Sequence, residues 1–488
     1  MENKYEAVIG LEIHAQLKTK SKMFCCCDND AEGKEPNTVV CPVCMGFPGA
    51  LPVPNKKAIE WTILLGLALG AEIAPTFNFE RKNYFYPDLP KGYQITSQTG
   101  PPVKGGELEI EVGKGKKTIR FNHIHLEEDA GKLVHPENSD FSLVDLNRAG
   151  TPLLEIVTEP DIFSAEEAKI FMQELQRILR YLDISFADME KGHLRADANI
   201  SLRPLKIQAP NSKAEIQNIK LGTKVEIKNI NSFSALERAL NYEIERQRDV
   251  LESGEKVIQE TRGWDDARGR TFSQRTKEMA HDYRYFPEPD IPEIIPKELF
   301  GELKKQIPVL PAQKREDYRK KGFSDSLIQV VASDPIYFKP FESSFSKFTD
   351  PQDYKIYDQL FMLSGWPLIK EGKELSEWAI ANIAATAVSI RKGEVTGNIA
   401  KQYLSESIST GVPLMNLLEQ KGIKEISGDQ ELEVFVDQVI NENPEPVADY
   451  KAGKEQALQF LMGQVMKKTR GQANPAVTQE ILKKKLRS

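Results

Sequence analysis

The segment Ile9-Gly-Leu-Glu-Ile-His-Ala-Gln-Leu17 alternates apolar and polar side chains residue by residue. Because successive side chains of a β-strand point to opposite faces, its apolar residues would face a core. Glu12, His14 and Gln16 would then share the other face. This period of two predicts a strand that is buried on one side only.

Three later segments repeat this alternation, and each presents a set of polar side chains on one face. The sets are His123, His125 and Glu127; Arg195, Asp197, Asn199, Ser201 and Arg203; and Lys224, Glu226 and Lys228. A solvated antiparallel sheet produces such a pattern without any function. Solvated faces, however, usually carry interchangeable Lys, Glu, Thr and Ser, whereas His, Asp, Asn and Arg are prominent here. We therefore expect an α+β fold whose N-terminal antiparallel sheet has one working face.

A metal site is expected on this face. Glu155 lies in the apolar run Pro152-Leu-Leu-Glu-Ile-Val157, where a carboxylate is costly to bury without a partner. Mg²⁺ bridging nucleotide phosphates would supply that partner. The chain has no phosphate-binding loop of the G-x-x-x-x-G-K-[ST] type, and residues 113–118 are expected to form a hairpin turn. The phosphates would instead be held by basic side chains, namely Lys82, Lys91, Arg148, Arg195, Arg203 and Lys228.

All five cysteines lie between Cys25 and Cys44, as Cys25-Cys-Cys27 and Cys41-Pro-Val-Cys44. Two close thiol pairs are typical of a structural Zn²⁺ site. A redox C-x-x-C pair is the alternative, but it does not explain the first pair. Which two of Cys25, Cys26 and Cys27 bind the metal stays open at this point.

The chain is 488 residues long, which allows two to four domains. Ser164 and Glu167 predict a helix start with a capping box, a second helix is expected between Ser234 and about Gly254, and residues 61–73 read as a packed helix. A proline-rich stretch at 286–292 precedes segments with helical patterns. We expect domains at residues 1–294, with a metal-binding insertion at 25–44, and two all-helical domains at 295–410 and 411–488.

The net charge is −7, but the C-terminal end is basic. A basic end suits binding of a polyanion, although a solvated helix would have the same composition. The basic side chains there include Lys467, Lys468, Arg470, Lys483, Lys484 and Lys485. No apolar run approaches the roughly 20 residues that span a bilayer, and the first residues lead directly into a strand pattern. A cytoplasmic protein without a leader peptide or membrane contact is expected.

The sequence resembles the GatB family of the tRNA-dependent amidotransferases along essentially its whole length. The segments that carry the resemblance are Val8-Ile-Gly-Leu-Glu-Ile-His14, Pro48-Gly-Ala-Leu-Pro52, Arg81-Lys-Asn-Tyr-Phe-Tyr-Pro-Asp88, Leu126-Glu-Glu-Asp-Ala-Gly-Lys132, Leu143-Val-Asp-Leu-Asn-Arg148, Arg195-Ala-Asp-Ala-Asn-Ile-Ser201 and His281-Asp-Tyr-Arg-Tyr-Phe-Pro-Glu-Pro-Asp290.

This resemblance implies a ligase that uses ATP to phosphorylate the side-chain carboxylate of Glu-tRNA(Gln) or Asp-tRNA(Asn), after which ammonia displaces the phosphate. It implies a heterotrimer with an amidase subunit, GatA, which supplies the ammonia, and a small subunit, GatC. It also implies a cradle-shaped catalytic domain akin to those of glutamine synthetase and the guanidino kinases, and a YqeY-like tail that contacts tRNA. Which of the two tRNA substrates is used stays open.

The resemblance also assigns residues. The implied Mg²⁺ site comprises Glu12, His14, Glu127 or Glu128, and Glu155, with Asp197 and Asn199 completing it or orienting the substrate. Lys82, Tyr84 and Lys91 match the region where ammonia arrives, and Arg148, Arg203 and Lys228 are either phosphate contacts or structural ion pairs. The zinc ligands implied are Cys25, Cys27, Cys41 and Cys44.

Three other functions share some of these features. A stand-alone ligase acting on a free amino acid would share the metal site but would need neither tRNA nor partners. In a non-catalytic tRNA-binding subunit the polar strand faces would only be solvated. A self-contained glutaminase would need an amidase signature with paired Ser and Lys, which the sequence does not display.

Overall fold

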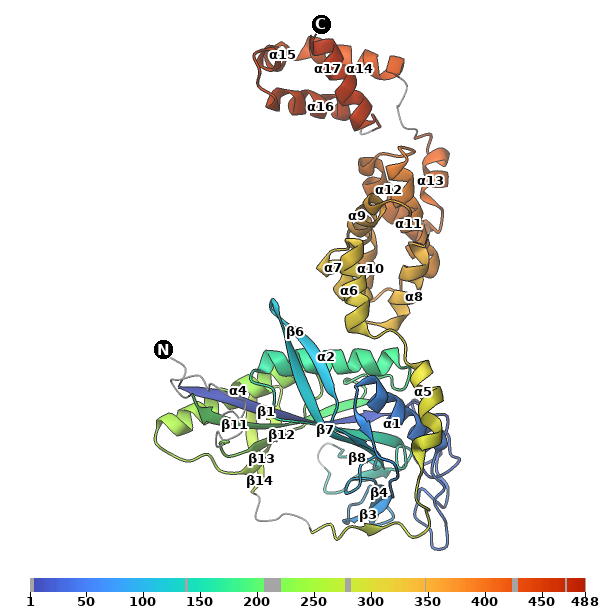
Figure 1. The fold of residues 1–488 in the computed structure, drawn as a ribbon, viewed down its shortest axis with the longest axis vertical. Helices are drawn as coiled ribbons and strands as arrows, with labels where there is room; N and C mark the ends of the chain where they lie inside the picture. Colours follow the sequence, from blue (N-terminus) through green and yellow to red (C-terminus); the bar gives the residue numbers. More distant parts are fainter. Residues whose placement is uncertain are drawn as a thin grey trace. The chain divides into compact units, whose positions relative to one another are not determined.

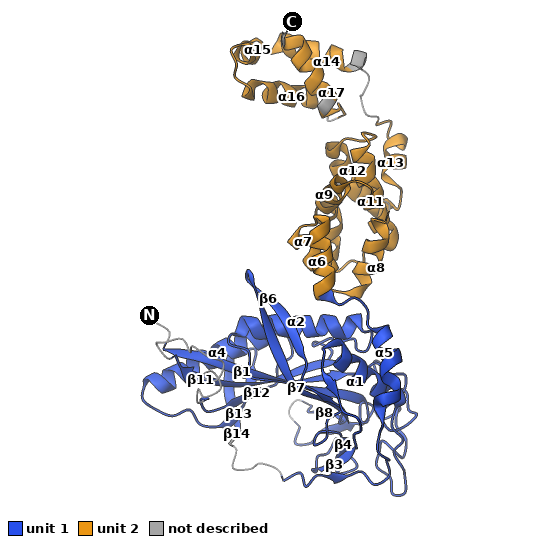
Figure 2. Cartoon of the chain, viewed as in Figure 1, with its two compact units in different colours: residues 1–311 blue, residues 312–488 orange. Residues whose placement is uncertain are grey.

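The computed structural model describes residues 4–136, 139–205, 221–276, 282–346, 348–423, 429–469 and 472–487. The chain forms two compact units, Met1–Pro311 and Ala312–Ser488 (Figure 2). Across these described ranges, no helix combines the length and the apolar character needed to cross a membrane.

The first unit is built on a large β-sheet (Figure 1), which has 13 strands among the described residues. Its main path runs β14 (Arg270–Thr276), β13 (Glu260–Asp265), β12 (Val225–Lys228), β11 (Leu194–Pro204), β1 (Tyr5–Gln16), β10 (Pro152–Thr158), β7 (Gly115–Glu128), β4 (Tyr93–Thr96), β3 (Glu80–Asn83) and β15 (Phe286–Pro287). Off this path are β2 (Glu72–Ile73), β5 (Val103–Lys104) and β6 (Glu107–Val112). A separate pair is formed by β8 (Lys132–Val134) and β9 (Leu143–Asp145).

Strand β1 lies inside this sheet, antiparallel to both β10 and β11. Its apolar residues from Ile9 to Ala15 are buried, whereas Glu12, His14 and Gln16 are half-buried on the other face. The predicted two-faced strand is therefore confirmed. The hairpin turn predicted near Gly113 is confirmed as well, because it joins β6 to β7.

The expectation of a purely antiparallel sheet is wrong at one position, because β12 and β13 are parallel. Helix α4 (Phe233–Glu252) connects these two strands. A crossover helix returns the chain to the end of the sheet from which it left, so the next strand runs in the same direction. The sheet is therefore mixed. The likeness to glutamine synthetase and the guanidino kinases stays a prediction.

Helices α2 (Ala165–Tyr181) and α4 lie along one face of the sheet (Figure 1) and contribute to its apolar core. Ser164 caps α2 as predicted, by accepting a hydrogen bond from the Glu167 backbone N–H. The Glu167 carboxylate, however, accepts from the backbone N–H of Phe163, one residue before the cap. Helix α4 begins two residues earlier than predicted, because its capping residue is Ser232.

Helix α1 (Lys56–Ala68) begins and ends about five residues earlier than the predicted helix at 61–73. The side chain of Asn55 accepts hydrogen bonds from the first backbone N–H groups and so fixes the start. Gly66 lets the helix approach β5 closely, since a Cβ there would lie 2.8 Å from methyl carbons of Val103.

The second unit is helical throughout its described elements, and its apolar residues form two separate clusters. The first cluster extends from Tyr318 to Leu418 and the second from Leu432 to Leu486. In the first unit, α5 (Phe300–Gln306) follows the short 3-10 helix η2 (Pro296–Leu299). The helices that lead into and build the first cluster are α6 (Pro311–Lys321), α7 (Asp325–Val331), α8 (Pro335–Ser344), α9 (Pro351–Leu360), the π-helix η3 (Phe361–Gly365), α10 (Trp366–Lys370), α11 (Glu377–Arg391), α12 (Gly397–Thr410) and α13 (Leu414–Gln420). Those of the second cluster are α14 (Asp429–Glu442), α15 (Pro444–Lys451), α16 (Gln456–Lys468) and α17 (Pro475–Arg487). The division into three domains at 294 and 410 stays a prediction.

Candidate active site and zinc site

Four adjacent strands place charged side chains in one row across the working face. The register pairs Arg195 of β11 with His14 of β1, His14 with Glu155 of β10, and Glu155 with His125 of β7. Directly opposed residues of an antiparallel sheet have their Cβ atoms about 5 Å apart. Strand register alone therefore brings together four residues that are far apart in the sequence.

Two groups of potential metal ligands overlap in this row. Ligand atoms of Glu12, His14 and Glu155 lie within 4.8 Å of one another, and so do those of His125, Glu127 and Glu155. Glu155 Oε2 is 3.3 Å from His14 Nε2 and 3.5 Å from His125 Nε2. Glu155 thus belongs to both triads and lies between them.

The electrostatics of the row show an excess of negative charge. Burial raises the pKa of Glu12 to about 7, and the charges of Glu155 and Asp197 contribute to this rise. Burial alone would raise the pKa of Glu155, but the hydrogen bond from His14 and the charges of His14 and His125 hold it below its usual range. Burial alone would lower the pKa of His14, but Glu155 outweighs this effect and raises it. A bound cation would allow the carboxylates to ionise together.

The chemistry of the donor atoms fits a divalent cation. His125, Glu127 and Glu155 are almost fully buried, and both ring nitrogens of His125 and Oε2 of Glu127 have no hydrogen-bond partner among the described residues. Buried polar atoms without partners are rare and costly. Carboxylate oxygens suit Mg²⁺ and Mn²⁺, and the two imidazoles are donors that transition ions accept readily.

Of the two glutamates considered for this site, only Glu127 belongs to a triad. Glu128 lies on the other side of the alternating strand β7, where it forms an ion pair with Lys91 and accepts a hydrogen bond from the Ile95 backbone N–H at 3.0 Å. Lys91 is consequently engaged with Glu128. It also contributes, with Tyr93, to the wall of a cavity of about 60 Å³.

Sequence reasoning missed Asp129, which joins several polar side chains beside the row. Asp129 Oδ2 accepts hydrogen bonds from Gln16 Nε2 and Arg195 Nη2, each at 2.8 Å, and lies 3.6 Å from Arg148 Nε. Burial alone would raise the pKa of Asp129, but Arg195 and Arg148 hold it below its usual value. The three consecutive carboxylates of Glu127-Glu-Asp129 indicated a candidate functional site. Strand β7 ends at Glu128, however, so alternation could not predict the direction of the Asp129 side chain.

Lys82 and Tyr84 lie at the other end of the working face. The charge of Lys82 contributes to lowering the pKa of Glu155, and its Nζ is 5.0 Å from the centre of the Tyr283 ring. The Tyr84 and Tyr283 rings meet edge to face, 6.0 Å apart. Tyr283 is a second residue that sequence reasoning did not assign, although it lies in one of the segments that resemble the family.

The remaining predicted polar residues are mostly paired with protein groups. Lys228 Nζ binds Asp197 at 2.7 Å, and Arg203 Nε binds Glu6 at 2.7 Å. Arg148 donates hydrogen bonds to the backbone oxygens of Ala130 and Gly131. Asn199, by contrast, has a buried side-chain oxygen without a partner among the described residues. These contacts match the structural ion pairs considered as an alternative for Lys228 and Arg203.

The four predicted zinc ligands lie together in the cysteine module, residues 25–44. The Sγ atoms of Cys25, Cys27, Cys41 and Cys44 are all within 4.8 Å of one another, and Cys41 and Cys44 are 3.9 Å apart. Four sulfurs bound tetrahedrally to Zn²⁺ would be about 3.8 Å apart. Cys26 is exposed and outside the group, which favours Cys25 and Cys27 as the first pair.

The ionisation of these thiols also fits a bound cation. A hydrogen bond from Cys25 lowers the pKa of Cys44 to about 5, and the same bond raises that of Cys25. Buried Lys22 places its Nζ 3.8 Å from Cys44 Sγ and donates to the backbone oxygen of Val39 at 2.8 Å. An adjacent ammonium would partly offset the negative charge of a four-thiolate zinc site.

The basic side chains predicted to bind tRNA lie on α16 and α17. Lys468 pairs with Glu442 at 2.7 Å, and Lys485 pairs with Asp437 at 2.5 Å. Lys467 and Lys484 are exposed and Lys483 is half-buried. Arg470 lies outside the described residues.

Comparison with known proteins gives concordant matches over both units. A family model described as the GatB/GatE catalytic domain matches residues 7–301, and one described as the GatB domain matches residues 367–486. The chain is 46% identical over 488 residues to the B subunit of the aspartyl/glutamyl-tRNA(Asn/Gln) amidotransferase of Thermoanaerobacter pseudethanolicus, with 99% of each chain covered. It is 46% identical over 487 residues to the protein of the same name from Persephonella marina, covering 99% of this chain and 100% of the relative.

Among solved structures, the tRNA binding domain of glutaminyl-tRNA synthetase from Saccharomyces cerevisiae matches 36% of this chain and 92% of that domain. The two are 16% identical with a TM-score of 0.23, which is too low to support a conclusion about the fold.

Proposed function

The chain belongs to the GatB family, the B subunits of the glutamine-dependent aspartyl/glutamyl-tRNA(Asn/Gln) amidotransferases, and on this basis we propose that it performs the ATP-dependent amidation itself. Its substrate would be the side-chain carboxylate of Glu-tRNA(Gln), Asp-tRNA(Asn) or both. The observation that carries the proposal is the pair of ligand triads that share Glu155 on the working face.

Two balanced steps make up the reaction. A carboxylate oxygen attacks the γ-phosphorus of ATP, the bond to the β,γ-bridging oxygen breaks, and ADP leaves. Ammonia then attacks the activated carbonyl carbon, its surplus proton is released, and the carbon–oxygen bond to phosphate breaks. Phosphoryl transfer depends on positioning and charge neutralisation more than on covalent catalysis. Bound Mg²⁺ would supply that neutralisation.

The residues of the row would divide this work. Glu12, Glu127 and Glu155 would hold the cations, and His14 and His125 would act as further ligands or hydrogen-bond donors toward phosphate oxygens. The positive charge of Lys82 contributes to lowering the pKa of Glu155. This effect supports a role for Lys82 in orienting the anionic substrate. Asp129 would fix the direction of Arg195, to which it is hydrogen-bonded.

Ammonia would come from the partner amidase, GatA, with GatC completing a heterotrimer. Lys82, Tyr84 and Lys91 are proposed for the end of the ammonia path, and the helical tail for tRNA contacts. The same proposal includes four further predictions: the cradle fold, the three-domain division, the structural role of zinc and a cytoplasmic location. Its support is family membership together with the four-sulfur group.

An amidation assay tests this proposal. The chain, assembled with GatA and GatC, receives ATP, Mg²⁺, ammonium and mischarged tRNA, and the amide formed on the tRNA is measured. Glu12→Gln and Glu155→Gln are each expected to lower the rate at least a hundredfold. Glu166→Gln, which changes an exposed glutamate at the start of α2, is the matched control.

Using ammonium in place of glutamine removes the amidase step, so a loss of activity reports on this chain. Amide formation with free glutamate would instead support the stand-alone ligase. Full activity of both variants would place the chemistry elsewhere and leave the chain with a tRNA-binding role only.

A further inference from the structure

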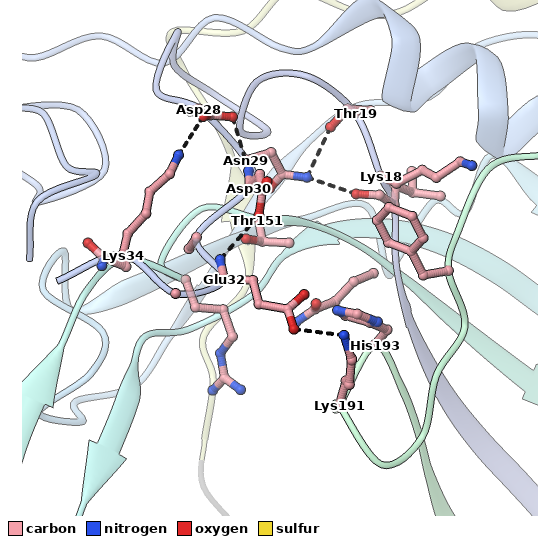
Figure 3. Close-up of a pocket in the computed structure, with 18 of the residues that line it drawn as sticks. Lys18, Thr19, Asp28, Asn29, Asp30, Glu32, Lys34, Thr151, Lys191 and His193 are labelled. Atoms are coloured by element: carbon pink, nitrogen blue, oxygen red, sulfur yellow. Dashed lines mark hydrogen bonds and ion pairs between the residues drawn. The ribbon is translucent and has the colours of Figure 1, made fainter. Parts of the chain in front are cut away.

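A cavity of about 970 Å³ opens beside the working face, at the C-terminal end of β1 (Figure 3). Its walls come from the end of β1 and the residues after it (16–20), the loop 28–34 of the cysteine module, Lys132 of β8, the segment 145–151 and the turn 186–193. This volume is at the upper end of the range for small-molecule sites. Neither the two triads nor the cysteine ligands lie in its walls.

The charge of the cavity wall favours an anion. Six lysine or arginine side chains line it, against four aspartates and glutamates. Two of the lysines are paired inside the wall: Lys34 with Asp28 at 2.6 Å and Lys191 with Glu32 at 2.7 Å (Figure 3). Lys20 and Lys132 have no ion-pair partner among the described residues, so their charges are available to a ligand.

The wall also presents an aromatic ring. The Phe186 side chain lines the cavity and is 59% exposed, which is unusual for phenylalanine. Its backbone is held in place, because Arg180 Nε donates to the Phe186 oxygen at 2.8 Å. Lys18 Nζ lies 5.1 Å from the ring centre, and the His193 ring is 5.5 Å away. Aromatic rings with cations nearby are the usual platforms on which unpaired nucleobases stack.

The cavity lies beside the proposed active site along β1. Gln16 lines it and lies on the same face of β1 as His14, while Lys18 follows two residues later. At about 3.3 Å per residue, Lys18 lies roughly 13 Å along the chain from His14. That span is comparable with the reach from the base to the reacting group in ATP or in an aminoacylated adenosine.

We propose that this cavity binds an adenine nucleoside, with the base against Phe186 and the attached phosphate beside Lys20 and Lys132. The reacting end of the ligand then extends along β1 to Glu155. This inference rests on the proposed function, which supplies two sources of the same chemistry. One is the adenosine of ATP, and the other is the 3′-terminal adenosine of tRNA.

Equilibrium binding separates the two sources. The chain assembled with its partners is titrated with ATP and Mg²⁺, with uncharged tRNA, and with the same tRNA lacking its 3′-terminal adenosine. Phe186→Ala is compared with Phe186→Trp, which keeps a stacking surface, and with Phe272→Ala, which removes another exposed ring. Loss of one base–aromatic stack is expected to raise the dissociation constant about tenfold.

Weaker binding of intact tRNA by Phe186→Ala, with no change for truncated tRNA, assigns the cavity to the tRNA end. Weaker binding of ATP alone assigns it to ATP, and Phe186→Trp should restore either affinity. The proposal would be overturned if Phe186→Ala bound ATP and tRNA within twofold as tightly as Phe272→Ala. It would also be overturned if Phe186→Ala lost the same affinity for intact and for truncated tRNA. Because the readout is binding, it is independent of whether Glu155→Gln abolishes amidation.

Discussion

Arg81 and Glu288 are 207 positions apart in the sequence, yet their side chains form a two-pronged ion pair, with Nε–Oε2 at 2.6 Å and Nη2–Oε1 at 2.9 Å. The Glu288 side chain is fully buried. The ion pair links Glu288, which directly follows β15, to β3, the strand that also carries Lys82. A returning segment of chain therefore stabilises the strand next to the working face.

Arg81→Met should destabilise the protein markedly, since it leaves the Glu288 carboxylate buried without its partner. We expect a loss of about 3 kcal/mol in the free energy of unfolding, measured by denaturant titration of the full chain. Arg238→Met, which breaks an exposed pair with Asp266, should cost less than about 1 kcal/mol. Equal effects of the two substitutions would contradict this ranking.

Glu155→Gln should weaken metal binding at both triads, because Glu155 is the ligand they share. Glu12→Gln and Glu127→Gln should each weaken one triad only. Mn²⁺ suits carboxylate and imidazole donors. Calorimetric titration with Mn²⁺ gives the number of bound ions and their affinities. We expect two ions per wild-type chain and at least tenfold weaker binding of both in Glu155→Gln. If Glu155→Gln behaved like the two other variants, the triads would not form a joint site.

Cys44→Ser should remove the metal of the cysteine module and lower the melting temperature, because a structural zinc site contributes directly to folding stability. Cys26→Ser changes the exposed neighbouring thiol and is the matched control. Metal analysis of the purified chain should find one zinc in the wild type and in Cys26→Ser, and none in Cys44→Ser. Zinc loss in both variants would mean that Cys26 is a ligand.

Asp161 should make stability depend on pH. Burial alone would raise its pKa, but hydrogen bonds from Arg120 hold the pKa below its usual value in the folded protein. Such a carboxylate stabilises the fold above its unfolded pKa of about 3.9, and this contribution is lost as the pH falls. Asp161→Asn should therefore be about 1 kcal/mol less stable at pH 7, since the pair is partly solvated. The difference in free energy of unfolding between the wild type and Asp161→Asn, measured by denaturant titration, should shrink as the pH falls below about 4. A difference independent of pH would rule out this linkage.

Tail lysines without an ion-pair partner among the described residues should contribute to tRNA binding more than paired ones. Lys467→Ser and Lys484→Ser should each weaken binding and reduce the slope of log affinity against log salt by roughly one. Lys468→Ser and Lys485→Ser should have smaller effects, because these side chains already pair with Glu442 and Asp437. Binding measured at several salt concentrations tests this order. Its reversal would mean that tRNA displaces the ion pairs.

Features with local signals could be predicted from the sequence. The two faces of β1 follow from alternation, and the start of α2 follows from the hydroxyl of Ser164. The gathering of the cysteines at one site follows from their spacing, but spacing alone does not separate Cys25 and Cys27 from Cys26. Alternation in β7 likewise favours Glu127 over Glu128, since only Glu127 shares a face with His125.

Features that depend on distant partners could not be predicted. The direction of β13 is set by how α4 packs, and Asp129 is oriented by Gln16 and Arg195 rather than by its own strand. The cavity lined by Phe186 requires five separate segments of the chain to meet, and no periodic pattern encodes that meeting.

The pairing of β1 also has a consequence during synthesis of the protein on the ribosome. β1 is made first, but its neighbours β10 and β11 begin at Pro152 and Leu194. At 5 to 20 residues per second, synthesis from residue 16 to 204 takes roughly 10 to 40 seconds. Strand β1 has neither of these neighbours until β10 has been made, and its other edge stays unpaired until β11 follows, so the nascent chain is exposed to aggregation. The strand that organises the working face is thus made well before the two strands that pair with it.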